Sequence, residues 1–159
     1  MGHAAIGTSK LDKQLPGKAR WLGYAGLLPQ LIAVILFVRG GEWGWIALAG
    51  GFAYASLIFS FLGGVWWGQT LTAPAAPRWA FVAAILPSLL ALALFMPWTL
   101  GWDWPGPSLL WLGVLIGLSP LVDRKLGMGN SAWVRLRWQL SLGLGAVTLV
   151  LAILALQHP

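Results

Sequence analysis

Five long apolar runs fill most of this sequence and constrain its fold more than any other feature. The runs cover residues 21–38, 45–67, 79–100, 108–122 and 137–156. A helix rises ~1.5 Å per residue and the hydrocarbon core of a bilayer is ~30 Å thick, so about 17–25 apolar residues cross it. Because 58% of the 159 residues are hydrophobic and only 9% are charged, the chain has too few polar groups to cover a globule in water. The sequence therefore predicts an all-α integral membrane bundle of five transmembrane helices.

The fourth run, 108–122, is the shortest, and the distribution of charge indicates whether it crosses. With five crossings, nine of the ten lysines and arginines fall on the side of the N-terminus, and Arg39 falls on the other. Without a fourth crossing this asymmetry would collapse. Basic residues mark the cytoplasmic side, so we expect a cytoplasmic N-terminus and a C-terminus on the opposite side. The nine residues are Lys10, Lys13, Lys18, Arg20, Arg78, Arg124, Lys125, Arg135 and Arg137.

Tryptophan supports the same arrangement. The 12 tryptophans fall near the ends of the runs or in the outer loops, and Trp66 and Trp67 are among those at the cytoplasmic ends. Membrane interfaces favour tryptophan because the ring is buried while its N–H stays hydrated. We therefore interpret the tryptophans as interfacial anchors, in preference to a tryptophan-lined cofactor site.

We divide the chain into a basic cytoplasmic tail, 1–20, and one membrane domain, 21–157. The tail does not have the form of a secretory signal, because no cleavable apolar core follows a short basic start. The net charge of +6 comes from short basic stretches between the apolar runs. That pattern is typical of an orientation signal, so no nucleic-acid partner is expected.

Small residues recur at four-residue spacing in the second and fourth runs. Side chains four residues apart lie on one helix face, and small ones allow a second helix to pack closely. We expect helix packing at these positions and favour it over a ligand cleft. The candidate packing residues are Ser56, Ser60, Gly64, Gly68, Gly113 and Gly117. Proline inside a run predicts a kink, and whether such kinks form a binding site stays open; these prolines are Pro29, Pro87, Pro97 and Pro120.

Chemically reactive groups are nearly absent from the runs. No Asp, Glu, Lys or Arg lies at the centre of a run, the histidines are His3 and His158, and the chain has no cysteine. This excludes thiol and iron–sulfur chemistry and argues against a haem, a histidine metal site or a proton pump. The sequence therefore predicts no cofactor, no metal site and no catalytic residue, as in a non-enzymatic protein.

Two polar features remain as candidate sites. Gln30 and Tyr54 lie within runs and are candidates for a small polar pocket, although such groups more often tie helices together. A charged cluster joins the fourth and fifth runs and is a candidate for binding anionic lipid headgroups. In the simpler interpretation, Asp123 pairs with one arginine and fixes the loop. The cluster consists of Asp123, Arg124, Lys125, Arg135 and Arg137.

Several strings occur in a fixed order along the chain. They are LGYAGLLP at 22–29, YASLIFSFLGGVWWG at 54–68, LPSLL at 86–90, and Asp123 followed by WVRLR at 133–137 and LS at 140–141. Together they resemble domain-of-unknown-function family 3429, whose members are similar to transmembrane protein sixty-nine of mitochondria, over roughly residues 20–157. The resemblance implies a five-helix membrane protein of bacterial inner membranes or mitochondria, with no established activity and no catalytic residues. Trp66 departs from the basic or polar residue expected there in relatives.

These observations favour a small, non-enzymatic inner-membrane protein. The leading hypothesis is an accessory subunit or assembly factor that docks onto a larger membrane complex, and the alternative is a protein that binds or carries a lipid or an isoprenoid quinone. The expected partners are membrane lipids and a membrane protein. The expected location is the bacterial inner membrane, with the mitochondrial inner membrane as the alternative.

Overall fold

The computed structural model describes residues 17–102, 105–127 and 131–157, and the regular structure in these ranges is entirely helical. The elements are α1 (Gly17–Ala25), α2 (Leu28–Arg39), α3 (Trp43–Thr72), α4 (Trp79–Thr99), α5 (Gly106–Lys125) and α6 (Ser131–Gln157). α1 and α2 together make the first crossing, so five helical segments are long and apolar enough to cross a membrane. The predicted all-α architecture with five spans is confirmed.

The helices extend beyond the apolar runs. α3 has 30 residues, and α5 has 20 residues where the fourth run suggested a short span. Hydropathy marks the hydrocarbon core alone, while a helix continues through the headgroup layer with polar residues. For the same reason α1 begins at Gly17, inside the stretch assigned to the tail. The remainder of that tail lies outside the described residues.

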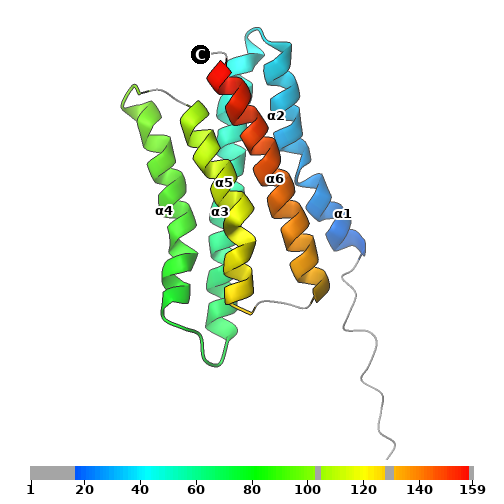
Figure 1. The fold of residues 1–159 in the computed structure, drawn as a ribbon, viewed down its shortest axis with the longest axis vertical. Helices are drawn as coiled ribbons and strands as arrows, with labels where there is room; N and C mark the ends of the chain where they lie inside the picture. The colour runs from blue at the N-terminus through cyan, green and yellow to red at the C-terminus, as the bar shows by residue number, and fades with distance from the viewer. Residues whose placement is uncertain (1–16, 103–104, 128–130, 158–159) are drawn as a thin grey trace, which may run out of the picture.

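α3 lies at the centre of the bundle and contacts α2, α4, α5 and α6. α5 and α6 form the most extensively packed pair, while α4 packs mainly on α3 at the edge of the bundle (Figure 1). Large apolar side chains cover the outside, and Leu57, Phe61 and Val82 are 60–69% exposed. Such a surface suits hydrocarbon and would be a large apolar patch in water.

The first crossing is broken between Ala25 and Leu28. Pro29 has no backbone N–H, so it cannot make the hydrogen bond that would continue the helix from α1. Short turns close the break, with bonds of 3.1 Å from Gly26 to Leu22 and 3.0 Å from Leu27 to Tyr24. The Tyr54 hydroxyl of α3 donates to the Gly26 carbonyl and thereby satisfies an acceptor at the break. The other prolines remain inside continuous helices: Pro87, Pro97 and Pro120.

Glycines set the closest approaches between helices. A Cβ on Gly63 would lie 2.2 Å from the Ala84 carbonyl oxygen, so α3 and α4 meet there with almost no side chain between them. Between α5 and α6, a Cβ on Gly145 would lie 2.8 Å from the Gly113 carbonyl oxygen and 3.0 Å from the Gly117 nitrogen. The predicted packing residues Gly113 and Gly117 therefore face a third glycine, as expected for closely packed membrane helices.

The row of small residues in α3 is not a single flat face. Four residues turn a helix by about 40° more than one full turn, so Ser56 and Gly68 differ by about 120° around the axis. Ser56 and Ser60 line a groove shared with α4. Gly64 and Gly68 are exposed, and a Cβ on either would meet nothing within 4 Å. The close packing predicted for these two glycines is made instead by Gly63, because it points at α4.

The neighbouring glycines provide a matched test of this packing. We expect Gly63→Ala to lower the free energy of unfolding by roughly 1–3 kcal/mol, because α3 and α4 must separate to admit a methyl group. Gly64→Ala should be neutral or stabilising by up to ~1 kcal/mol, because alanine favours helix and meets no neighbour. Thermal unfolding in detergent measures both effects. Equal effects of the two substitutions would contradict the close contact at Gly63.

Candidate functional site

A buried carboxylate lies where α3, α5 and α6 meet at the basic end of the bundle. Asp123, near the end of α5, is 1% exposed. Arg137 of α6 donates from Nε to Asp123 Oδ2 at 3.1 Å, and its Nη2 lies 3.1 Å from the same oxygen. The indole N–H of Trp66 in α3 donates to Asp123 Oδ1 at 2.6 Å. Because a buried charge is tolerated only when it is paired and hydrogen-bonded, these contacts tie three helices to one carboxylate.

Neighbouring groups enclose this network. The Arg137 guanidinium lies 5.6 Å from the ring centroid of Trp133, within the range of a cation–π interaction. Thr70 is buried one turn after Trp66 and donates to the Trp66 carbonyl at 2.7 Å. Both oxygens of the Asp123 carboxylate are therefore occupied by donors, which suits a structural tie between helices.

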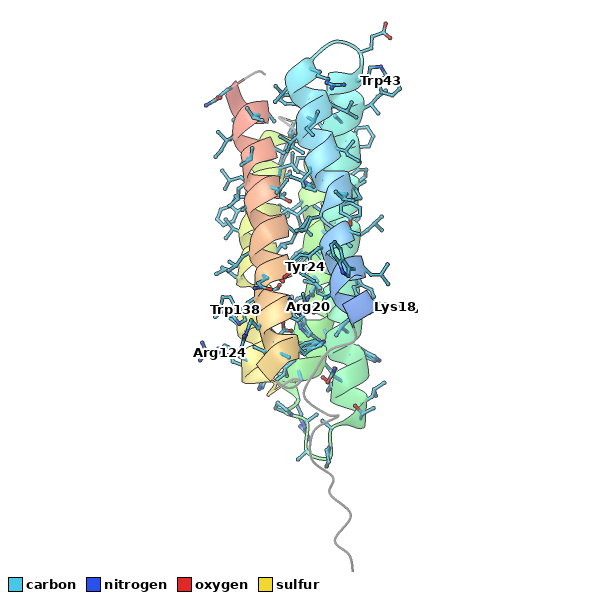
Figure 2. The ribbon with its side chains drawn as sticks, turned by 90° about the vertical axis from the view of Figure 1, so that its right-hand side faces the viewer. Lys18, Arg20, Tyr24, Trp43, Arg124 and Trp138 are labelled. Atoms are coloured by element: carbon cyan, nitrogen blue, oxygen red, sulfur yellow. The ribbon has the colours of Figure 1, made fainter. Side chains whose placement is uncertain are left out.

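The charged cluster predicted between the fourth and fifth runs divides into two parts. Asp123 and Arg137 pair inside the bundle, as the simpler interpretation expected. The other three residues are exposed: Arg124, Lys125 and Arg135. Figure 2 shows Arg124 in the lower half of the bundle with Lys18 and Arg20, far from Trp43 at the upper end. The lipid-headgroup binding predicted for these exposed cations stays a prediction.

Trp66 is the main residue that sequence reasoning misjudged. It was counted as an interfacial anchor and as a departure from a polar residue, yet its side chain is 3% exposed and lies in the core. Its indole N–H is a polar group and donates to Asp123 Oδ1. Helical spacing could have indicated that Trp66 is buried. It follows Phe59 by seven positions and Leu62 by four, so the three buried residues lie on one face of α3.

Gln30 and Tyr54 do not share a polar pocket. Gln30 of α2 is fully buried, and its Nε2 donates to Thr148 Oγ1 of α6 at 3.1 Å. The hydroxyl of Tyr54 instead donates to Gly26 at the break in the first crossing. A third contact joins the Tyr24 hydroxyl to Gln139 Oε1 at 2.6 Å. These polar groups tie the first crossing to α3 and α6, which corrects the pocket expected from Gln30 and Tyr54.

The ion pair can be tested with a double-mutant cycle. We expect Arg137→Met to lower the free energy of unfolding by about 3–5 kcal/mol, because it leaves the Asp123 carboxylate buried without its counter-charge. Adding Asp123→Asn should recover much of that loss, because the amide stays an acceptor for Trp66 and carries no charge. The measurement is thermal or denaturant unfolding in detergent.

Arg135→Met is the matched control for this cycle. It removes the same charge from an exposed position of α6, so its effect should stay within about 0.5 kcal/mol. Similar losses for Arg135→Met and Arg137→Met would argue against a structural ion pair.

Comparison with known proteins places the chain in a family. Among curated proteins, Transmembrane protein 69 of Xenopus tropicalis is 41% identical over 86 residues, which cover 52% of this chain and 34% of the Xenopus protein. The chain thus spans about a third of the length of that relative. No solved structure matches this chain. Residues 15–154 match the family described as "Protein of unknown function (DUF3429)", and the chain belongs to this family.

Proposed function

We propose that this protein is a non-enzymatic accessory subunit or assembly factor that docks onto a partner membrane protein through the face of α3 at Gly64 and Gly68. We place it in the bacterial inner membrane, with the mitochondrial inner membrane as the alternative. The observation that carries this proposal is a pair of exposed glycines, four residues apart, that the bundle itself does not use.

Gly64 and Gly68 lower the stability of α3 without allowing any helix of this chain to pack more closely. Glycine in a helix interior is less favourable than alanine by about 1 kcal/mol. Gly51 and Gly63 offset this cost by admitting neighbouring helices, since a Cβ on either would clash with another element. A Cβ on Gly64 or Gly68 would meet nothing within 4 Å. Gly64 and Gly68 thus form a notch in the surface of α3, where a helix from another protein can approach the backbone closely. Such close contact matters in a membrane, because the hydrophobic effect does not drive helices together there.

The apolar residues around the notch and the charge of the nearby membrane surface indicate the kind of partner. Phe61 and Leu71, which lie one turn before Gly64 and one turn after Gly68, are 65% and 64% exposed. Arg78, just beyond α3, is exposed, as are Arg124 and Lys125 at the same end of the bundle. A second copy in the same orientation would bring like charges together at that membrane surface. Charge complementarity favours a different protein that carries acidic residues beside its transmembrane helix.

Site-specific cross-linking tests the docking face. A photoreactive side chain at Phe61 should give one discrete adduct in native membranes. Gly64→Leu combined with Gly68→Leu should abolish that adduct, because two leucines fill the notch, while the melting temperature stays unchanged or rises. Gly50→Leu is the control, since Gly50 is an exposed glycine of the other half of α3 with nothing within 4 Å. An adduct with the mass of two copies, or one that survives both leucines, would overturn the proposal.

The proposed orientation has its own test. The natural chain has no cysteine, so single cysteines report on topology without background. We expect a membrane-impermeant maleimide to label Glu42→Cys, in the loop between α2 and α3, on intact cells. It should label Ala75→Cys, between α3 and α4, only after permeabilisation, because the excess of basic residues marks the cytoplasmic side. The reverse pattern would show the opposite orientation.

A further inference from the structure

A groove of about 530 Å³ lies between α3 and α4 in the half of the bundle opposite to the Gly64 notch. This volume is within the range of ~300–1,000 Å³ that is typical of small-molecule sites. Leu57 and Leu92 line the groove and are 69% and 56% exposed, so it opens sideways toward the hydrocarbon. α4 lies at the edge of the bundle (Figure 1), and every residue that lines the groove belongs to α3 or α4. A ligand can enter from the bilayer.

The groove combines three hydroxyl groups with an aromatic end. The hydroxyls belong to Ser56 and Ser60 of α3 and to Ser88 of α4. At the aromatic end, the rings of Phe52 and Phe95 are stacked at 6.2 Å, and Trp98 meets Phe95 edge-on at 5.1 Å. A site for a hydrocarbon chain alone needs no hydroxyl, because each buried polar group has a desolvation cost.

The hydroxyl of Ser56 gives an indication of a ligand that is independent of the shape of the groove. Its Oγ is buried and has no hydrogen-bond partner among the described residues. A serine in a helix usually satisfies its hydroxyl on the carbonyl four residues earlier. Thr70, Thr72 and Thr148 do so elsewhere in this protein, at 2.7–3.4 Å. The Oγ itself has almost no accessible surface, so it reaches the groove by rotation about χ1, and an unsatisfied donor on a groove-lining residue then points to an acceptor supplied by a ligand.

Depth in the membrane narrows the chemistry of that acceptor. At ~1.5 Å per residue, the three serines lie within about 5 Å of the midpoints of α3 and α4. The ester carbonyls of phospholipids lie near the edge of the hydrocarbon core, ~15 Å from its centre. They therefore do not reach the serines. An uncharged lipid whose polar carbonyls travel to the bilayer centre fits this depth.

We propose that this groove binds an isoprenoid quinone. Ser56 donates a hydrogen bond to one ring carbonyl, Ser60 and Ser88 line the same end, and the tail runs out between Leu57 and Leu92. The ring is flat and carries acceptors but no charge, which fits a site with hydroxyl donors, an aromatic wall and no ionisable lining residue. The groove is lined by residues 49–60 of α3, whereas the notch lies one to two turns further along the helix at Gly64 and Gly68, so this site does not depend on the docking proposal.

Binding can be followed with a decyl-tailed benzoquinone added to the purified protein in detergent. The quinone should raise the melting temperature in a concentration-dependent way, and an alkane of the same length should not. Ser56→Ala should weaken quinone binding roughly fivefold, as expected for one lost hydrogen bond. The same substitution should leave the ligand-free protein equally or more stable, because it removes an unsatisfied donor. A purely structural hydroxyl would give the opposite stability result.

Two further variants keep the test decisive. Ala53→Leu, at an exposed position lining the groove, should fold normally and abolish the quinone effect by filling the site. Ser141→Ala is the matched control, because its hydroxyl is bonded to Ser119 at 3.2 Å between α5 and α6. It should lower stability and leave quinone binding unchanged. Equal effects of quinone and alkane, or quinone binding that survives Ala53→Leu, would overturn the proposal.

Discussion

The carboxylate of Asp123 is the interaction on which the basic end of the bundle depends. It lies out of contact with solvent, so its charge must be neutralised and its oxygens must accept hydrogen bonds inside the protein. Arg137 supplies the counter-charge from α6 and Trp66 supplies a donor from α3. Three helices are therefore held in one register, because sliding any of them would leave a charge or a donor unpaired. This specificity explains why a chain with so few ionisable groups keeps one of them buried.

Elsewhere the bundle depends on backbone contact. Lipid tails are as apolar as leucine side chains, so burying leucine gives little preference for one helix pairing over another. Gly63 against Ala84, and Gly113 against Gly145, allow main chains to touch and define which faces meet. The first crossing combines a close glycine contact with polar ties. A Cβ on Gly51 of α3 would lie 3.2 Å from the Cβ of Ala33, and hydrogen bonds join Gln30 to Thr148 and Tyr54 to Gly26.

The number of spans was predictable because apolar length and charge asymmetry each report it independently. Residue roles were less predictable, because they depend on the direction in which a side chain points. Trp66 and Trp67 are adjacent and chemically identical, yet the first is buried against Asp123 and the second is 42% exposed. Gly63 and Gly64 differ in the same way. A spacing of four residues identified a row of small side chains. It did not show that this row winds around the helix by about 40° at each step, so that its members face different neighbours.

That rotation has a functional consequence for α3. Because the row advances by about 40° at each step, its serine half turns toward α4 and its glycine half turns outward. A strictly flat row would have given one packing seam and left nothing for a partner or a ligand. The observed row produces two surfaces of different chemistry on one helix, a groove with hydroxyl donors and a notch with bare backbone. The central helix of the bundle thus carries both of the surfaces for which we propose a function, the quinone groove and the docking notch.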